Sequence, residues 1–123
     1  MTYTQLIAAA QALTGRYRPS EDCCTGDVGA VILSAAGHTY AGVCLDFQGG
    51  LGFCAEHAAV AEMVKHHEAE IAVVVAVDQD GRVLPPCGRC REMMWQLHDQ
   101  NVHAMVVLGP DRAVPLADLL PYR

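Results

Sequence analysis

Two short stretches contain the residue types that bind a metal ion and move protons. The first reads Cys-Ala-Glu-His at positions 54–57, and the second reads Pro-Cys-Gly-Arg-Cys-Arg at positions 86–91. Together they offer three thiols and one nearby carboxylate. A zinc ion with three protein ligands keeps its fourth position open for water, which is typical of a catalytic site. The spacing therefore favours a catalytic zinc site over a purely structural one.

The predicted zinc ligands are Cys54, Cys87 and Cys90, and Glu56 is the predicted catalytic residue. Cys/His-x-Glu followed by Pro-Cys-x-x-Cys is the pattern of zinc-dependent nucleobase deaminases. Bound zinc brings the pKa of water to around 7, which generates hydroxide at neutral pH. This hydroxide would attack the ring carbon. Glu56 would take the proton, deliver it to the ring nitrogen and help to expel the amino group as ammonia.

Both motifs are predicted to begin helices, which places Cys87 and Cys90 on one face. The partial positive charge at a helix start favours the thiolate that zinc needs. Three thiolates on Zn²⁺ leave a net charge of −1, so donors to the sulfurs should matter. We expect Arg91, and next Arg89, to take this role around the metal. The alternative for either arginine is a side chain in solvent.

Strands that alternate with helices predict an α/β protein with helices on both faces of one sheet. The chain is expected to form one domain, 1–123. Glycines at positions 49, 50 and 52 lie in a loop able to pass close to a ligand. The predicted helices are 2–14, 54–67, 87–100 and a short 115–120, and the predicted strands are 28–35, 38–45, 70–77 and 102–108.

Composition excludes several classes of function. The net charge is −6 and the eight Lys and Arg residues are scattered, so no polynucleotide surface is expected. The longest apolar run, 71–77, is far shorter than the roughly 20 residues of a membrane span. No signal peptide is apparent, so a cytoplasmic protein with reduced cysteines is expected. Cys23, Cys24 and Cys44 are then best explained by packing.

With these motifs in hand, the chain resembles the small, zinc-dependent cytidine deaminase family. The resemblance runs over nearly the whole sequence and includes Val28-Gly29-Ala30 at the first strand. It implies a three-layer α/β/α sandwich with a mixed sheet and one zinc ion per chain. It also implies a homotetramer with active sites near subunit interfaces, a small nucleoside-like substrate, and the ligand and catalytic residues named above.

The second predicted strand departs from the nucleoside-type members of that family. Those members place an Asn and a Glu there to hold the ribose hydroxyl, whereas this chain has Val43-Cys44-Leu45-Asp46. Other stretches resemble the blasticidin-S deaminase branch, among them 20–22, 42–43, 87–91, 119–121 and Phe47 with its following glycines. In that branch an arginine before the Pro-Cys motif binds substrate, which implies Arg82. The candidate substrate contacts are thus Asp46, Arg82 and Phe47.

Three alternatives stay open from the sequence. A noncatalytic zinc-stabilised module would close the site with a fourth ligand, such as Cys44 or a histidine. A thiol redox protein would use Cys87 and Cys90 without zinc. Within the deaminases, the substrate could be cytidine, deoxycytidine, a blasticidin-S-type compound, or a free or modified base.

Overall fold

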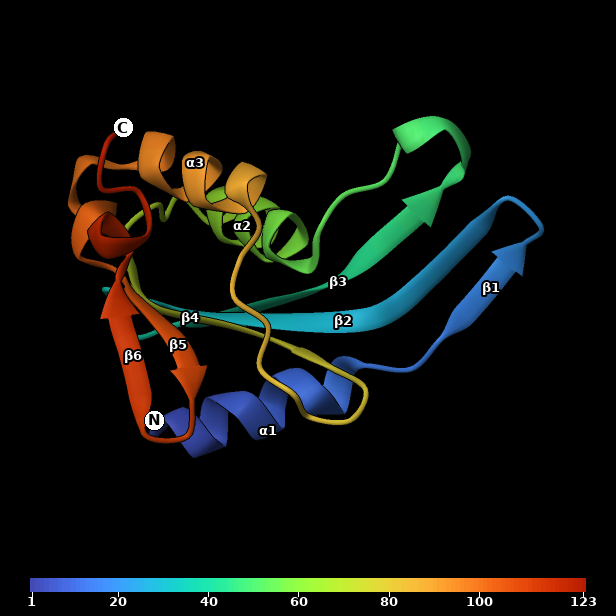
Figure 1. Cartoon of the computed structure of the whole chain (residues 1–123), viewed down its shortest axis with the longest axis horizontal. Coiled ribbons are helices and arrows are strands. Elements are labelled where there is room, and N and C mark those ends of the chain that lie inside the picture. Colours follow the sequence, from blue (N-terminus) through green and yellow to red (C-terminus); the bar gives the residue numbers. More distant parts are fainter.

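The computed structural model describes residues 1–123 and has three layers. One helix, α1 (Tyr3–Leu13), covers one face of a six-stranded sheet, and α2 (Ala55–Lys65) and α3 (Gly88–Leu97) cover the other, as Figure 1 shows. The predicted α/β/α sandwich is confirmed. None of the helices has the length and apolar character needed to cross a membrane.

The sheet is mixed, as the resemblance implied. Its strands are β1 (Tyr17–Ser20), β2 (Cys23–Ser34), β3 (Thr39–Phe47), β4 (Ile71–Asp78), β5 (Met105–Gly109) and β6 (Arg112–Pro115). The long strand β2 pairs antiparallel with β3 along one edge and with β1 and then β4 along the other. Only β4 and β5 are parallel. The order β1-β2-β4-β5-β6 leaves β3 at the edge beside β2.

Two strands, β1 and β6, were not expected from the sequence. Each has four residues and contains a proline, Pro19 in β1 and Pro115 in β6. Proline cannot donate to a central ladder but is tolerated at a sheet edge, which is where both strands lie. The short helix predicted for 115–120 is a single 3-10 turn at Leu116–Leu119.

The apolar core has two main parts, one on each face of the sheet. Leu6 and Ala10 of α1 pack on Val31, Val75 and other strand residues. On the opposite face, side chains of α2 and α3 pack on the sheet, among them Ala59, Met63, Cys90 and Met94. This second cluster fixes α2 and α3 on the same face, so that the two cysteine motifs can meet.

Two glycines permit close approach between helix and sheet. A Cβ at Gly42 of β3 would lie 2.4 Å from the Ala58 Cβ of α2, and one at Gly29 would lie 2.4 Å from the Ala10 carbonyl oxygen of α1. Real side chains do not tolerate such contacts, so only glycine lets these helices lie directly on the strands. Gly42 thereby sets the position of α2, which carries the first motif.

A projecting arm extends from one end of the sheet. It consists of β1, the first part of β2 and the end of β3 with the turn Gln48–Gly50, which lie beyond the helices in Figure 1. Tyr17 and Phe47 on this arm and Leu51 just after it are exposed. The arm therefore presents apolar side chains that the chain itself leaves uncovered.

Candidate metal centre and substrate pocket

The starts of α2 and α3 bring the two cysteine motifs together. Cys54 is the N-cap of α2 and Cys87 is the N-cap of α3, as predicted. The Cys54 Sγ lies 3.5 Å from the Cys87 Sγ, which in turn lies 3.5 Å from the Cys90 Sγ. Residues three apart at a helix start share a face, which explains the second contact. The three sulfurs thus form one compact group.

This group fits a zinc ion. Zn–S bonds of about 2.3 Å in a tetrahedral site place two sulfurs about 3.8 Å apart, close to the spacing observed. A second donor set shares two of these residues, because the ligand atoms of Cys54, His57 and Cys90 lie within 4.8 Å of one another. The His57 Nδ1 is 3.4 Å from the Cys90 Sγ. Cys54 and Cys90 thus belong to both donor sets. The third donor is Cys87 in one set and His57 in the other.

The three thiols differ in how readily they ionise. Burial raises the pKa of Cys54, and burial together with the charge of Glu56 raises that of Cys90. Burial also opposes ionisation of Cys87, but backbone N–H groups of Cys90 and Arg89 and the neighbouring thiols outweigh it, so its pKa is lowered. The helix-start effect expected from the sequence therefore prevails only at Cys87. Zinc binding must displace the protons at the other two.

Glu56 lies in the first turn of α2 and is 5% exposed. Burial is the main cause that raises the pKa of its carboxyl group. A carboxyl group with a raised pKa exchanges protons more easily near neutral pH. Glu56 also lines the same pocket as Cys54 and Cys87. Its position suits a group that moves protons beside the metal.

The pocket has a volume of about 410 Å³. Its wall comes from β2, β3, the start of α2, β4 and the loop before α3, and it includes Cys54, Glu56, Cys87, Arg89 and Asp46. Neither His57 nor Cys90 lines the pocket, although Cys90 is one of the three thiols and His57 contacts it. Cys54 and Cys87 therefore lie on the pocket side of the metal centre, and Cys90 and His57 lie on the side away from the pocket.

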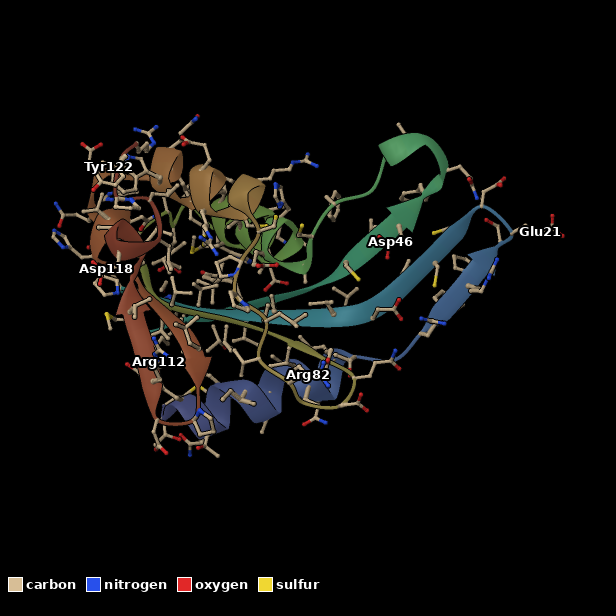
Figure 2. The ribbon with its side chains drawn as sticks, viewed as in Figure 1. Glu21, Asp46, Arg82, Arg112, Asp118 and Tyr122 are labelled. Carbon is tan, nitrogen blue, oxygen red and sulfur yellow. The ribbon has the colours of Figure 1, made fainter.

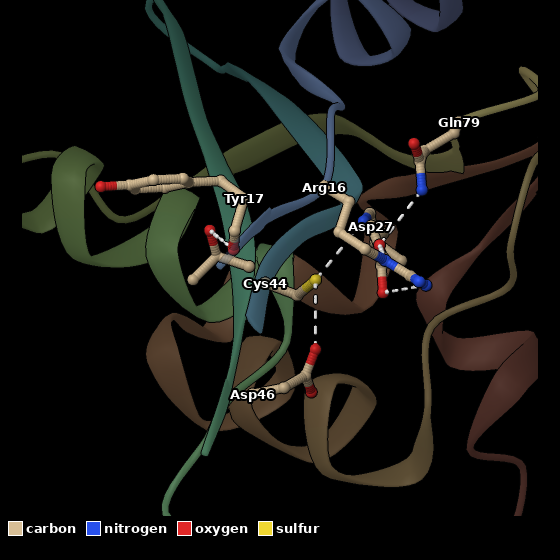
Figure 3. Close-up of polar contacts among 8 residues, drawn as sticks. Arg16, Tyr17, Asp27, Cys44, Asp46 and Gln79 are labelled. Carbon is tan, nitrogen blue, oxygen red and sulfur yellow. Dashed lines mark hydrogen bonds and ion pairs between the residues drawn. The ribbon is translucent and has the colours of Figure 1, made fainter. Parts of the chain in front are cut away.

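The outer part of the pocket carries carboxylates and a thiol (Figure 3). Cys44 and Asp46 lie two residues apart on β3 and both line the pocket, as alternating residues of a strand do. The Cys44 Sγ accepts a hydrogen bond from the Val28 N–H at 3.4 Å and lies 3.9 Å from Asp46 Oδ2. Asp46 has no ion-pair partner. Its carboxylate is therefore free to accept hydrogen bonds from a ligand.

Asp27 is a second pocket carboxylate and is held on two sides. Arg16 donates to both of its oxygens, at 2.9 and 3.2 Å, and the Gln79 amide donates at 3.1 Å (Figure 3). Sequence reasoning did not select Asp27, because its partners come from α1's end and from the turn after β4. Only the tertiary structure brings them together.

The expected role of Arg91 is not seen. Its Nε donates to the Pro86 carbonyl oxygen at 2.7 Å and its Nη1 to that of Leu119 at 3.3 Å, so the guanidinium ties the start of α3 to the C-terminal 3-10 turn. No cysteine sulfur receives a hydrogen bond from it. His57 makes the contact with Cys90 instead. Arg89 is exposed and lines the pocket, and its guanidinium donates no hydrogen bond to a sulfur.

Two proposed substrate contacts lie away from the pocket. Arg82 follows a tight turn that Asp78 closes, its side chain is 76% exposed, and its Nε is 4.0 Å from Asp78 Oδ2. Figure 2 shows Arg82 on the α1 side of the sheet and Asp46 on the other. Phe47 borders only a smaller hollow on the arm, which Asp46 lines as well. Within one chain, Asp46 is the only one of the three that reaches the pocket.

Two further residues that line the pocket, Phe53 and Cys44, were not among the predicted site residues. Phe53 directly precedes Cys54 and lines the pocket. Cys44 was assigned to packing, and it does pack with Ala30, Ala55 and Ala76, but it reaches the pocket as well. The alternation of strand residues was the signal available for Cys44, since Asp46 was already a candidate.

Comparison with known proteins decides the family. Residues 2–106 match the model of the cytidine and deoxycytidylate deaminase zinc-binding region. The chain belongs to this family. A cytidine deaminase of Mycobacterium tuberculosis is 33% identical over 114 residues, which cover 92% of this chain and 81% of the relative. One of Halalkalibacterium halodurans is 29% identical over 116 residues, 92% of this chain and 86% of the relative.

Solved structures of this deaminase family share the fold. The crystal structure of cytidine deaminase from Mycobacterium tuberculosis gives a TM-score of 0.82 at 29% identity, covering 99% of this chain and 96% of that one. The cytidine deaminase from Burkholderia pseudomallei gives 0.78 at 30% identity, covering 99% and 98%. This protein is therefore a zinc-dependent hydrolytic deaminase that acts on a small molecule.

Proposed function

We propose that this deaminase hydrolyses the exocyclic amino group of a cytosine ring in a nucleoside or nucleoside-like compound. The observation that carries the proposal is the group of three thiols beside the buried Glu56 at the wall of one pocket. In this proposal Cys54, Cys87 and Cys90 hold zinc. Their sulfur spacing supports this set, and the pocket on the Cys54 and Cys87 side leaves room for water at the fourth position.

When bound, zinc supplies a Lewis acid that makes water nucleophilic at neutral pH. The protein must then move protons, and Glu56 has the position for this. Its carboxylate takes one proton from water and passes it to the ring nitrogen, and it then takes the second proton of that water and delivers it to the departing amino group. One water molecule is consumed, the C–N bond is replaced by a carbonyl, and ammonia leaves. The low exposure of Glu56 keeps these transfers away from bulk solvent.

The proposed substrate end of the pocket is formed by β3. Cys44 and Asp46 stand on this strand where nucleoside-type members were expected to carry Asn and Glu. Asp46 is therefore the proposed acceptor for a substrate hydroxyl, and Asp27 lies in the same wall. Cytidine and deoxycytidine are the first candidate substrates because the matched relatives are named cytidine deaminases. A blasticidin-S-type compound is the second candidate, since the replaced pair changes the sugar end of the pocket.

A homotetramer is part of the proposal. The exposed Tyr17 and Phe47 of the arm and Leu51 just after it support the proposal, because large apolar side chains left uncovered are typical of subunit contacts. Phe47, which does not reach the pocket of its own chain, and Arg82 are proposed to contact substrate only through such an assembly. Light scattering coupled to size exclusion measures the mass, and a monomer would contradict this part.

The test of the proposed function is ammonia release by the zinc-loaded protein. The panel contains cytidine, deoxycytidine, cytosine, blasticidin S and aminopurines. Release from a cytosine compound supports the proposal. The compound with the highest kcat/KM shows which group the β3 end of the pocket binds in place of, or as, the sugar. Release from aminopurines alone would overturn the choice of base. No release from any compound by a protein with one zinc per chain would favour the noncatalytic zinc module.

A further inference from the structure

Outside the thiol group, His57 is the one residue whose side-chain nitrogen lies within hydrogen-bond distance of a cysteine sulfur of the metal centre. We propose that His57 is a positioning residue whose Nδ1–H donates a hydrogen bond to the Cys90 Sγ and holds this sulfur for zinc, without being a ligand itself. The inference rests on the ligand set given under the proposed function. It assigns to His57 the role that the sequence had suggested for Arg91.

The backbone and the ring of His57 are both held in place. Its N–H donates to the Cys54 carbonyl oxygen at 3.0 Å in the first turn of α2. The imidazole stacks on the Phe53 ring, with centroids 6.3 Å apart and planes 18° apart. The Nδ1 lies 3.4 Å from the Cys90 Sγ, within the range of a hydrogen bond to sulfur. The ring is thus fixed between an aromatic face and a thiol.

Cys90 needs such a donor more than the other two cysteines. It is completely buried in the cluster that α2 and α3 form on the sheet, whereas Cys87 is exposed. A buried thiolate cannot obtain hydrogen bonds from water, so an N–H from the protein must take their place. Arg91 is bound to two carbonyl oxygens and Arg89 is exposed, which leaves His57.

The geometry favours a donor over a fourth ligand. The Cys87 Sγ is 3.5 Å from each of the other two sulfurs, so three thiols already form one face of a tetrahedron. The pocket opens at Cys54, Cys87 and Glu56, and His57 does not line it. The free position therefore faces the pocket, where the substrate must enter, and His57 supports Cys90 from the other side.

Cobalt substitution tests this arrangement without relying on activity. Zinc is removed from the full-length protein and Co²⁺ is added, so that the near-ultraviolet thiolate-to-cobalt band reports the number and energy of the bound thiolates. Zinc affinity is measured in parallel by competition with a chelator. The variants are His57→Phe, which keeps a planar ring on Phe53 but has no N–H, and His57→Asn, whose side-chain amide keeps an N–H donor at the position of the His57 Nδ1. Cys87→Ser tests the ligand set.

The expected result has three parts. His57→Phe keeps the intensity of the thiolate band but shifts it to longer wavelength, because a thiolate without its hydrogen bond is more easily oxidised. Its zinc affinity falls roughly 10- to 100-fold, as for other partners of metal ligands. His57→Asn restores most of the affinity and the band position. Cys87→Ser lowers the intensity by about one third, as three thiolates become two.

Two results would overturn the inference. An unchanged band position and zinc affinity in a folded His57→Phe protein would remove the donor role. A loss of tetrahedral cobalt bands in His57→Phe, with unchanged thiolate intensity in Cys87→Ser, would make His57 a ligand and also overturn the cysteine ligand set. If His57→Phe does not fold by circular dichroism, His57→Leu replaces it. Leucine has no N–H to donate to Cys90, so an affinity equal to that of His57→Asn would contradict the proposal.

Discussion

Cys54 and Cys87 are 33 residues apart in the chain, yet their sulfurs are 3.5 Å apart. The reason is that each residue caps a helix, and both helices lie on the same face of the sheet. The metal centre is thus formed by two helix starts rather than by a loop. Substitutions that move a helix should therefore affect the site as well as the stability of the fold.

Replacement of Glu56 by Gln should separate metal binding from catalysis. The amide has the size of the carboxyl group but cannot accept and return a proton. Zinc content should stay at one per chain, and kcat for ammonia release should fall roughly 10²- to 10⁴-fold. Metal analysis and steady-state kinetics provide the two measurements. Turnover at the wild-type rate in the Gln variant would rule out the proposed proton path.

Replacement of Asp46 by Asn should weaken substrate binding. The carboxylate reaches the pocket and has no ion-pair partner, so the change to Asn removes the negative charge and one of two acceptor oxygens without breaking the fold. A hydrogen bond to a charged group contributes about 1.5–3 kcal/mol, which corresponds to a fall in kcat/KM of roughly 10- to 100-fold. Most of this fall in kcat/KM should result from a higher KM. Asp80→Asn, on an exposed turn outside the pocket, is the control. Equal KM values for both variants would exclude contact between Asp46 and substrate.

Replacement of Gly42 by Ala should destabilise the protein and disturb the metal centre. The added Cβ would lie 2.4 Å from the Ala58 Cβ, and the neighbouring contacts are backbone atoms of α2 that cannot turn aside. Overpacking of this kind costs about 1–3 kcal/mol of unfolding free energy. Urea unfolding of the zinc-loaded protein measures it. Gly109→Ala is the control, since nothing lies within 4 Å of its Cβ. Equal stability of the two variants would show that α2 is not seated on Gly42.

Glu68 should make stability depend on pH in the acid range. Its carboxylate accepts hydrogen bonds from Tyr40, Ser34 and His38, with Tyr40 the largest cause, and these lower its pKa from 4.5 to about 2. A depressed pKa means that the folded state favours the carboxylate. The contribution to stability is therefore complete above pH 4.5 and is lost as the pH falls toward 2.

The measurement is the thermal midpoint of wild type and Glu68→Gln between pH 6 and pH 2. We expect the wild type to melt higher at pH 6 and the difference to vanish near pH 2. Glu70→Gln, at an exposed carboxylate whose side chain makes no hydrogen bond, should follow the wild type throughout. A difference between wild type and Glu68→Gln that stays constant down to pH 2 would contradict this explanation.

The sequence was a good guide wherever the signal was local. The apolar periods placed α1, α2, β4, α3 and β5, and the cysteines were correctly expected at helix starts. Strands β1 and β6 were missed because Pro19 was interpreted as part of a loop and Pro115 as the start of a short helix. Only their place at the edges of the sheet makes proline acceptable there.

The sequence by itself favoured the reaction class, because thiols and a carboxylate at this spacing have few other chemical uses, and the match to the family then decided it. The sequence did not determine which side chain supports the buried sulfur or which carboxylates line the pocket. Arg91 looked like the donor since it follows Cys90, but its direction on α3 turns it toward the Pro86 and Leu119 carbonyl oxygens. His57 contacts the Cys90 sulfur from α2, and Asp27 lines the pocket from β2. Such contacts depend on how helices and strands pack, and that is decided only when the whole chain has folded.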